Sequence, residues 1–160
     1  MREKILRIIE KNSRIELGEL AVLLGVEEID IVNELAAMES EGVICGYHTL
    51  IDCEKTSIEK TTALIEVRVT PQRGHGFDSI AERIYQYPEV RDVYLISGGY
   101  DLLIIMEGKT LKEIANFVSD KLSTQDSILS TATHFILKKY KEHGTILDKK
   151  STDERMQITP

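Results

Sequence analysis

The stretch "LGELAVLLGVEEIDIVNELAAMESEG", residues 17–42, determines how the first third of the chain folds. Its apolar residues recur at helical spacing in two runs separated by Gly25, and a glycine commonly follows the last turn of a helix. The runs are Leu17, Leu20, Ala21 and Leu24, then Ile31, Val32, Leu35 and Met38, and Gly42 closes the second. Together with an earlier stripe over residues 5–9, this pattern predicts three helices with a helix-turn-helix at their end.

The second helix of this pair carries six acidic residues between Glu27 and Glu41 and no Lys or Arg. Duplex DNA presents one negative charge about every 1.7 Å of its axis, so such a helix is an unusual partner for it. The acidic residues are explained by a solvated helix face, with Glu27 and Glu28 near the positive end of the helix dipole. The alternative interpretation is a helix that avoids DNA or meets a basic partner surface.

DNA binding through other groups is a third possibility for the same region. Arg7, Lys11 and Arg14 are placed to contact phosphates, while Asn33 suits a base edge such as that of adenine. Further cations of this part of the chain are Arg2, Lys4, Lys55 and Lys60.

The net negative charge of the chain lies mainly in its N-terminal third. The net charge is −7; residues 1–56 hold six basic and twelve acidic side chains, and residues 57–160 hold fourteen and fifteen. With 42% hydrophobic and 29% charged residues the composition is typical of a soluble globular protein. No apolar run approaches the roughly 20 residues of a membrane span, and no signal peptide is recognisable, so we expect a cytoplasmic protein without a membrane partner.

The two cysteines, Cys45 and Cys53, do not make a disulfide framework in a chain of this length. His48 lies between them, but the spacing matches no common ligand pattern and a fourth ligand is missing. We therefore expect neither a metal ion nor a cofactor.

The remainder of the chain predicts an alternating order of strands and helices. Residues 43–52 are strand-like, residues 53–61 form a polar connector, and residues 62–147 follow a βαββαβ order, before a polar tail at 148–160. The fold class is thus α+β, with a winged helix-turn-helix followed by a ferredoxin-like domain. Inward positions are expected at Ala63, Ile65, Val67 and Val69, at Leu111, Ile114, Ala115, Val118 and Leu122, and at Leu129, Thr131, Thr133, Phe135 and Leu137.

Four segments together resemble the Lrp/AsnC family of bacterial and archaeal transcriptional regulators over about residues 1–147. They are "ELAVLLGV", "EGVICGYHTLID", "SGGYDLLI" at 97–104 and "LSTATHFILKKY" at 129–140. The resemblance implies a DNA-binding domain at 1–52, a linker at 53–61, and an effector-binding and oligomerisation domain at 62–147. It also implies dimers that assemble further, commonly to octamers, and a small effector, usually an amino acid, held between dimers. The family's third helix normally carries several Arg or Lys residues, and this one departs from that pattern.

The segment "SGGYD" allows two interpretations. It is either a hairpin turn whose glycines only supply positive φ, or a site for a free amino acid. In the second case the N–H groups at Ser97, Gly98 and Gly99 hold the carboxylate, Asp101 pairs with the ammonium group, and Tyr100 covers the side chain. The resemblance places the family's effector site at this turn. Thr131 and Thr133 would complete it from a neighbouring dimer, or are ordinary strand residues.

No paired carboxylates, nucleophile elbow or phosphate loop indicates an enzyme. One enzymatic relative of this fold, the siroheme decarboxylases, uses His and basic residues around a tetrapyrrole. Arg68, Arg73, His75 and His134 are the residues here that such an activity would need. The sequence therefore favours an effector-responsive transcriptional regulator. An effector-binding oligomer without direct DNA binding and a siroheme decarboxylase-like enzyme are the alternatives.

Overall fold

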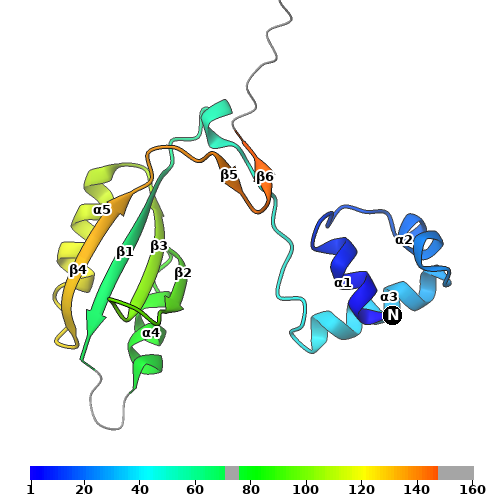
Figure 1. The fold of residues 1–160 in the computed structure, drawn as a ribbon, viewed down its shortest axis with the longest axis horizontal. Helices are drawn as coiled ribbons and strands as arrows, with labels where there is room; N and C mark the ends of the chain where they lie inside the picture. Colours follow the sequence, from blue (N-terminus) through cyan, green and yellow to red (C-terminus); the bar gives the residue numbers. More distant parts are fainter. Residues whose placement is uncertain (71–75, 148–160) are drawn as a thin grey trace, which may run out of the picture. The chain divides into compact units, whose positions relative to one another are not determined.

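The computed structural model describes residues 1–70 and 76–147. These residues fold as two compact units, Met1–Ile51 and a second that begins at Asp52, which are considered separately (Figure 1). The predicted polar tail at 148–160 lies outside the described residues, as do Arg73 and His75.

The first unit consists of three helices, α1 (Arg2–Ile9), α2 (Leu17–Leu24) and α3 (Glu28–Ser40). Gly25, after α2, has φ 67°, and Gly42, after α3, has φ 70°. Side chains are rarely tolerated at such left-handed angles, so both glycines end their helices where the sequence predicted. The helix-turn-helix is confirmed.

The core of this unit draws residues from all three helices. Ile5 of α1, Leu20 of α2 and Ile31 of α3 have at most 1% of their surface exposed, as does Met38. Val32 differs from its prediction, because 39% of its surface is exposed. The apolar stripe of α3 is therefore narrower than the sequence pattern implied.

The strand predicted for residues 43–52 is wrong, and so is the wing that it would have formed. No strand occurs in this range, and most of it is exposed. The N–H groups of Val43 and Ile44 both bond to the carbonyl oxygen of Met38, at 2.9 and 3.1 Å, and close the end of α3. No neighbouring strand is present among the described residues of this unit to pair with the remainder.

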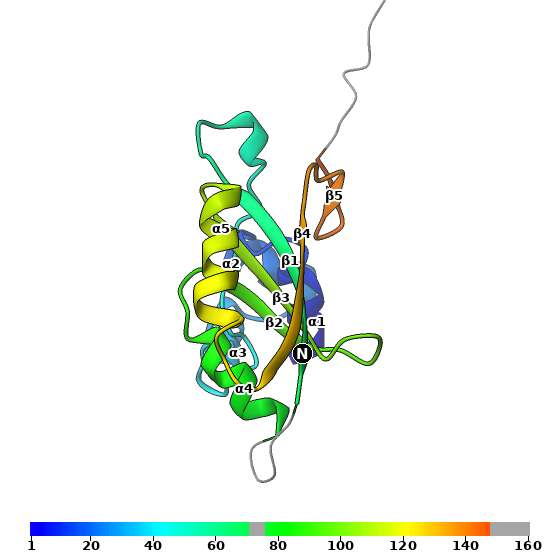
Figure 2. The ribbon, with the colours of Figure 1, turned by 90° about the vertical axis from the view of Figure 1, so that its left-hand side faces the viewer.

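The second unit is built on a four-stranded antiparallel sheet in the order β2-β3-β1-β4. Its strands are β1 (Thr61–Val69), β2 (Val90–Leu95), β3 (Leu102–Gly108) and β4 (Ile128–Phe135). Helices α4 (Phe77–Tyr85) and α5 (Leu111–Phe117) both lie on one face of this sheet (Figure 2). This is the predicted ferredoxin-like βαββαβ fold, and the α+β class with a helix-turn-helix followed by a ferredoxin-like domain is confirmed.

The apolar residues at every second position of β1, as predicted, lie in the core of the second unit. Ala63, Ile65, Val67 and Val69 are buried and belong to one cluster with residues of α4, α5 and β3. Removing an aliphatic side chain of this size from water contributes about 1.5–3 kcal/mol, so this face anchors both helices.

Two predicted inward faces differ from the structure. In α5, Leu111 and Ala115 are exposed, and Phe117 is buried instead. In β4 the register shifts opposite Arg68 and Val69, so Ile128 packs against the core. The same shift leaves Leu129 67% exposed, and Leu137, beyond the end of the strand, is 93% exposed.

Short elements flank the sheet. A 3-10 helix, η1 (Cys53–Lys55), lies in the predicted linker, and a π-helix, η2 (Val118–Leu122), continues α5. Strands β5 (Lys141–Glu142) and β6 (Thr145–Ile146) form a hairpin that the sequence analysis did not predict. Its two-residue turn has positive φ at His143 and Gly144, 45° and 78°, as the turns that suit hairpins require.

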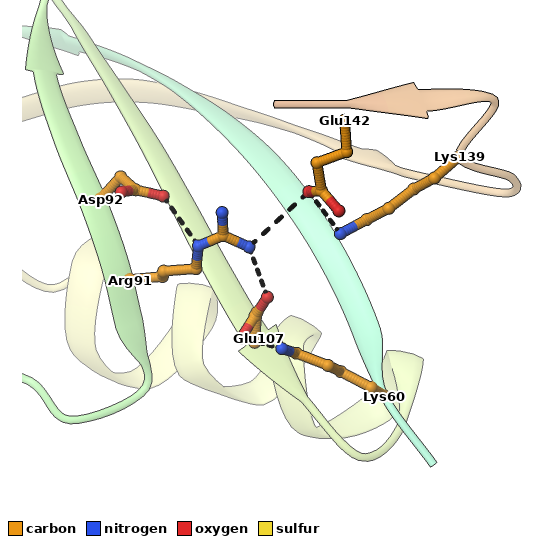
Figure 3. Close-up of polar contacts among 6 residues, drawn as sticks. All are labelled: Lys60, Arg91, Asp92, Glu107, Lys139 and Glu142. Atoms are coloured by element: carbon orange, nitrogen blue, oxygen red, sulfur yellow. Dashed lines mark hydrogen bonds and ion pairs between the residues drawn. The ribbon is translucent and has the colours of Figure 1, made fainter. Parts of the chain in front are cut away.

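An ion-pair cluster joins this hairpin to the sheet (Figure 3). Arg91 of β2 contacts Glu107 of β3 at 2.8 Å and Glu142 of β5 at 4.0 Å. Lys60 contacts Glu107 at 2.7 Å, and Lys139 contacts Glu142 at 2.8 Å. Burial raises the pKa of Glu107, but hydrogen bonds from Lys60 and Arg91 outweigh it and hold the pKa below its ordinary value of 4.5.

Replacing Glu107 with Gln should reduce the loss of stability in acid. Because the folded-state pKa of Glu107 lies below 4.5, its ion pairs stabilise the fold above that pH. They cease to do so as the pH falls through the folded-state pKa. Thermal unfolding of the second unit, followed by circular dichroism, should therefore depend less steeply on pH below 4.5 in Glu107→Gln. An exposed carboxylate on α4 offers the control Glu82→Gln, which should behave as the parent. Equal acid sensitivity of parent and Glu107→Gln would contradict the prediction.

Candidate functional site

The turn between β2 and β3 contains the predicted effector residues. Ser97, Gly98 and Gly99 are exposed, while Tyr100 and Asp101 are half-buried. The N–H of Ile96 bonds to the carbonyl oxygen of Asp101 at 2.8 Å and closes the hairpin. The three exposed residues therefore form a short loop beyond the last bond of the β2–β3 pair.

Asp101 fastens this loop to the end of β1. Its N–H donates to the carbonyl oxygen of Val67 at 3.0 Å, and its Oδ2 accepts the N–H of Val69 at 2.9 Å. Its Oδ1 has no hydrogen-bond partner among residues 1–70 and 76–147. Oδ2 of Asp101 thus has a structural role, and Oδ1 remains able to accept a hydrogen bond from a ligand.

The two glycines of the turn are not explained by backbone geometry. Neither Gly98 nor Gly99 has positive φ, which contradicts the interpretation that they only supply such angles. A Cβ at Gly98 would meet Ile96 at an ordinary 3.7 Å, and one at Gly99 would meet nothing within 4 Å. Within the described chain both positions have room for a side chain, so the turn itself does not require glycine.

Thr131 and Thr133 lie at the end of the sheet where the turn Ser97–Asp101 is attached, but on the face that the helices cover. In the register of β4 against β1, Thr131 is opposite Val67 and Thr133 is opposite Ile65, and both core partners are buried. Directly opposed residues share a face, so the two threonines are half-buried beside the core. The structure does not bring their hydroxyl groups to the turn of the same chain.

The face of the sheet that carries no helix has an apolar patch among polar residues such as Glu66, which is opposite Leu103. Leu64 of β1 is opposite Ile105 of β3, and Tyr94 of β2 is opposite Leu103. The three aliphatic residues are half-buried, and Tyr94 is 48% exposed. We call these four residues the open face of the sheet.

The acidic residues of α3 have internal partners in several cases. Arg2 of α1 contacts Glu34 at 2.5 Å and Glu41 at 2.6 Å, and these hydrogen bonds raise the pKa of the guanidinium and lower that of Glu41. Glu39 accepts a hydrogen bond from the hydroxyl of Tyr47 at 2.8 Å. Half of the six carboxylates are thus held by neighbouring side chains.

The predicted DNA-binding residues are all exposed. Arg7 lies on α1, Lys11 and Arg14 follow it, and Asn33 lies on α3. None of the three cations makes an ion pair within the described residues, and the Asn33 amide makes no hydrogen bond there. The linker cations differ, because Lys55 pairs with Asp52 at 2.8 Å and Lys60 with Glu107.

The other candidate residues do not assemble into a site. His134 lies on β4, 3.4 Å from a carboxylate oxygen of Glu66, and no described residue gathers with Cys45, His48 or Cys53 as a metal-binding group. No described helix is long and apolar enough to cross a membrane.

Helix α3 has an uncharged outer face that was not predicted from the sequence. Ile29, Asn33, Ala36 and Ser40 are exposed and follow the spacing i, i+4, i+7, i+11 of a single helix face. We call these four residues the outer face of α3. The acidic residues flank this face, so it carries no charge. The helical spacing of the polar residues is the signal in the sequence that predicts this uncharged face.

Comparison with known proteins identifies the family. The model of the Lrp/AsnC ligand binding domain matches residues 62–146, more than half of the chain. The HTH-type transcriptional regulator YugG of Bacillus subtilis is 46% identical over 158 residues, covering 98% of this chain and 95% of that protein. The proline dehydrogenase transcriptional activator of Rhodobacter capsulatus is 25% identical, covering 89% and 92%.

A solved structure shows the same fold. The transcriptional regulator NMB0573 of Neisseria meningitidis, in complex with L-Met, has a TM-score of 0.70 and 22% identity and covers 88% of this chain and 90% of its own. The relatives are regulators, which confirms the prediction that the chain is not an enzyme and leaves the tetrapyrrole alternative without support. The resemblance found in the sequence is confirmed: the chain belongs to the Lrp/AsnC family of transcriptional regulators.

Proposed function

We propose that this protein is a cytoplasmic regulator that binds DNA as an oligomer and takes a free amino acid at the turn Ser97–Asp101. The observation that carries the proposal is the turn itself, with two glycines that its own geometry does not require. Glycines at such positions allow close approach of a ligand to backbone N–H groups. Beside these N–H groups, Asp101 supplies a negative charge that can pair with the ammonium group of the amino acid.

The chemistry of an amino acid matches the groups of the turn. Its carboxylate would accept hydrogen bonds from exposed N–H groups at Ser97 to Gly99, and its ammonium would donate to the unpartnered Oδ1 of Asp101. Tyr100 is half-buried beside them and would contact the side chain. The relative from Neisseria meningitidis was solved with L-Met, a ligand of this class.

The open face of the sheet supports a dimer. Leu64, Leu103 and Ile105 are aliphatic residues on the face opposite to the one that α4 and α5 cover in the described part of this unit. A second copy of the same sheet would bury them, because identical faces meet in a twofold interface. Thr131 and Thr133 would then reach an effector only from a neighbouring dimer, as the family's octamers imply.

The exposed cations near α1 support direct DNA binding. Arg7, Lys11 and Arg14 have no ion-pair partner in the described chain and are available to phosphates. Each oligomer would present several such sets, and linked modules can exceed the affinity of one by 10² or more.

One observation favours the second candidate, an effector-binding oligomer without direct DNA contact. Residues 15–54 contain no Lys or Arg, so α2, α3 and the segment after them offer no basic side chain to phosphates. In that case the first unit would act through another protein.

Effector binding is tested with two substitutions of Asp101. Asp101→Asn keeps an oxygen to accept the N–H of Val69 but loses the charge, whereas Asp101→Ala loses both. In a thermal-shift screen of L-amino acids, beginning with L-methionine, the parent should be stabilised by about 2.7 kcal/mol at 100 times the Kd. Asp101→Asn should unfold like the parent without ligand and show little stabilisation with it. Asp101→Ala should also be destabilised without ligand, by about 1–3 kcal/mol. Undiminished stabilisation of Asp101→Asn would exclude ammonium pairing.

The oligomer is tested at the open face. Ile105→Asp places a charge at the centre of the proposed interface and should convert the dimer to a monomer at micromolar concentration in light scattering. Leu111→Asp is the control, because Leu111 is exposed on the helix side of the unit. Circular dichroism should show that both variants remain folded. A parent protein that is already monomeric would refute the interface.

Direct DNA contact is tested through its dependence on salt. The logarithm of affinity falls with the logarithm of salt concentration at about 0.9 per phosphate neutralised. Arg7→Ala with Lys11→Ala should therefore weaken binding to genomic duplex fragments and reduce the slope by about two per protomer in contact with DNA. Lys112→Ala, on α5, is a control for total charge. If the full-length oligomer binds no duplex even at low salt, the alternative without direct DNA contact is correct.

A further inference from the structure

The outer face of α3 is an exposed, uncharged part of the first unit. Ile29 is 62% exposed, and Asn33, Ala36 and Ser40 beside it are also exposed, although two of the four are apolar. Val32, 39% exposed, borders the face. Exposed aliphatic residues in a row on one helix indicate a surface with a partner.

The acidic residues of α3 leave this face uncharged. Asp30, Glu34 and Glu41 lie along one flank of the helix, and Glu28 and Glu39 along the other. Arg2 holds Glu34 and Glu41, and the Tyr47 hydroxyl holds Glu39, so three of the carboxylates are kept on the flanks. A ligand that approaches the outer face therefore first meets methyl groups and the free amide of Asn33.

The side chains of the outer face are of the kinds that contact adenine and thymine. In the major groove Arg and Lys recognise guanine, Asn recognises adenine by a paired hydrogen bond, and aliphatic groups contact the C5-methyl group of thymine. The absence of Lys and Arg from residues 15–54 removes the common side chains for guanine. Asn33 supplies the group for adenine, and Ile29 and Ala36, about one helical turn to either side of it, supply the groups for thymine.

We propose that the outer face of α3 selects A·T base pairs, with Ile29 and Ala36 contacting thymine methyl groups and Asn33 pairing with adenine. This rests on the proposed function, since it requires that the first unit binds DNA directly. On this basis specificity comes from apolar contact and one amide, while the cations of residues 4–14 supply affinity that does not depend on sequence. Ile29 and Ala36 are thus specificity-determining residues.

The proposal is tested with four alternating duplex polymers and the full-length protein, at one low salt concentration. They contain adenine with thymine, adenine with uracil, guanine with cytosine, and guanine with 5-methylcytosine. Uracil differs from thymine only by the lost methyl group, and 5-methylcytosine carries a methyl group at the corresponding position. Binding to the thymine polymer should exceed binding to the uracil polymer by about tenfold, equivalent to two methyl groups removed from water. Methylation of cytosine should strengthen binding to the guanine polymer in the same direction.

Two variants test the apolar part and the amide of the outer face separately. Ile29→Asn should reduce the ratio between thymine and uracil polymers towards one. Asn33→Ala should weaken binding to both adenine polymers relative to guanine polymers and leave the methyl ratio unchanged. Leu111→Asn, an exposed helical leucine of the second unit, is the matched control and should preserve every ratio.

Two results would overturn the proposal in distinguishable ways. Equal binding to the thymine and uracil polymers, with Ile29→Asn unchanged, would remove methyl recognition while leaving DNA binding by this unit intact. A change in the mass of the oligomer on Ile29→Asn, without a change in the methyl ratio, would mean that this face is a protein interface. Absence of binding to all four polymers and to genomic fragments would remove the proposed DNA contact and this inference together.

Discussion

A sheet has two faces, and the described helices of the second unit, α4 and α5, cover only one of them. The buried side of β1, from Ala63 to Val69, holds α4 and α5 in place, and the other side remains with aliphatic residues at Leu64, Leu103 and Ile105. The stability of the second unit and the proposed association of two copies would therefore depend on the two faces of the same sheet. An ion pair between Arg91 and Glu142 links the hairpin β5–β6 to the sheet, and the proposed second copy would cover the aliphatic part of the open face.

The same sheet fixes the turn that carries the proposed effector site. Asp101 bonds to β1 through its N–H and through Oδ2, so the position of the loop follows the end of the central strand. A ligand that bonds to this loop would be held against a rigid element. Such a loop, set at the edge of a face that another copy would cover, is suited to linking effector binding with assembly.

Regular features of the fold could be predicted from the sequence, and features that depend on register or on distant partners could not. The glycines at 25 and 42 and the alternation of β1 were correct, because each depends on local geometry. Leu129 was placed on the wrong face, since a single shift of register opposite Arg68 reverses the side chains beyond it. Residues 43–52 looked like a strand, but a strand needs a neighbour to bond with, and the hydrogen bonds to Met38 satisfy their first N–H groups. The acidity of α3 was apparent from the sequence, whereas the ion pairs of Glu34 and Glu41 with Arg2 depend on contact with a helix about thirty residues away.

The distribution of charge separates affinity from selectivity in the first unit. Unpaired cations are confined to the first fourteen residues, and α3 has an uncharged outer face between acidic flanks. Flanking carboxylates repel phosphates, so each unit should bind a duplex weakly and only where base contacts compensate. Weak modules gain most from assembly, because the second and later contacts are made at a high effective concentration. A regulator of this kind would respond to its effector most strongly if the ligand changes the assembly, since a change in the number of linked modules alters DNA affinity more than a change within one of them.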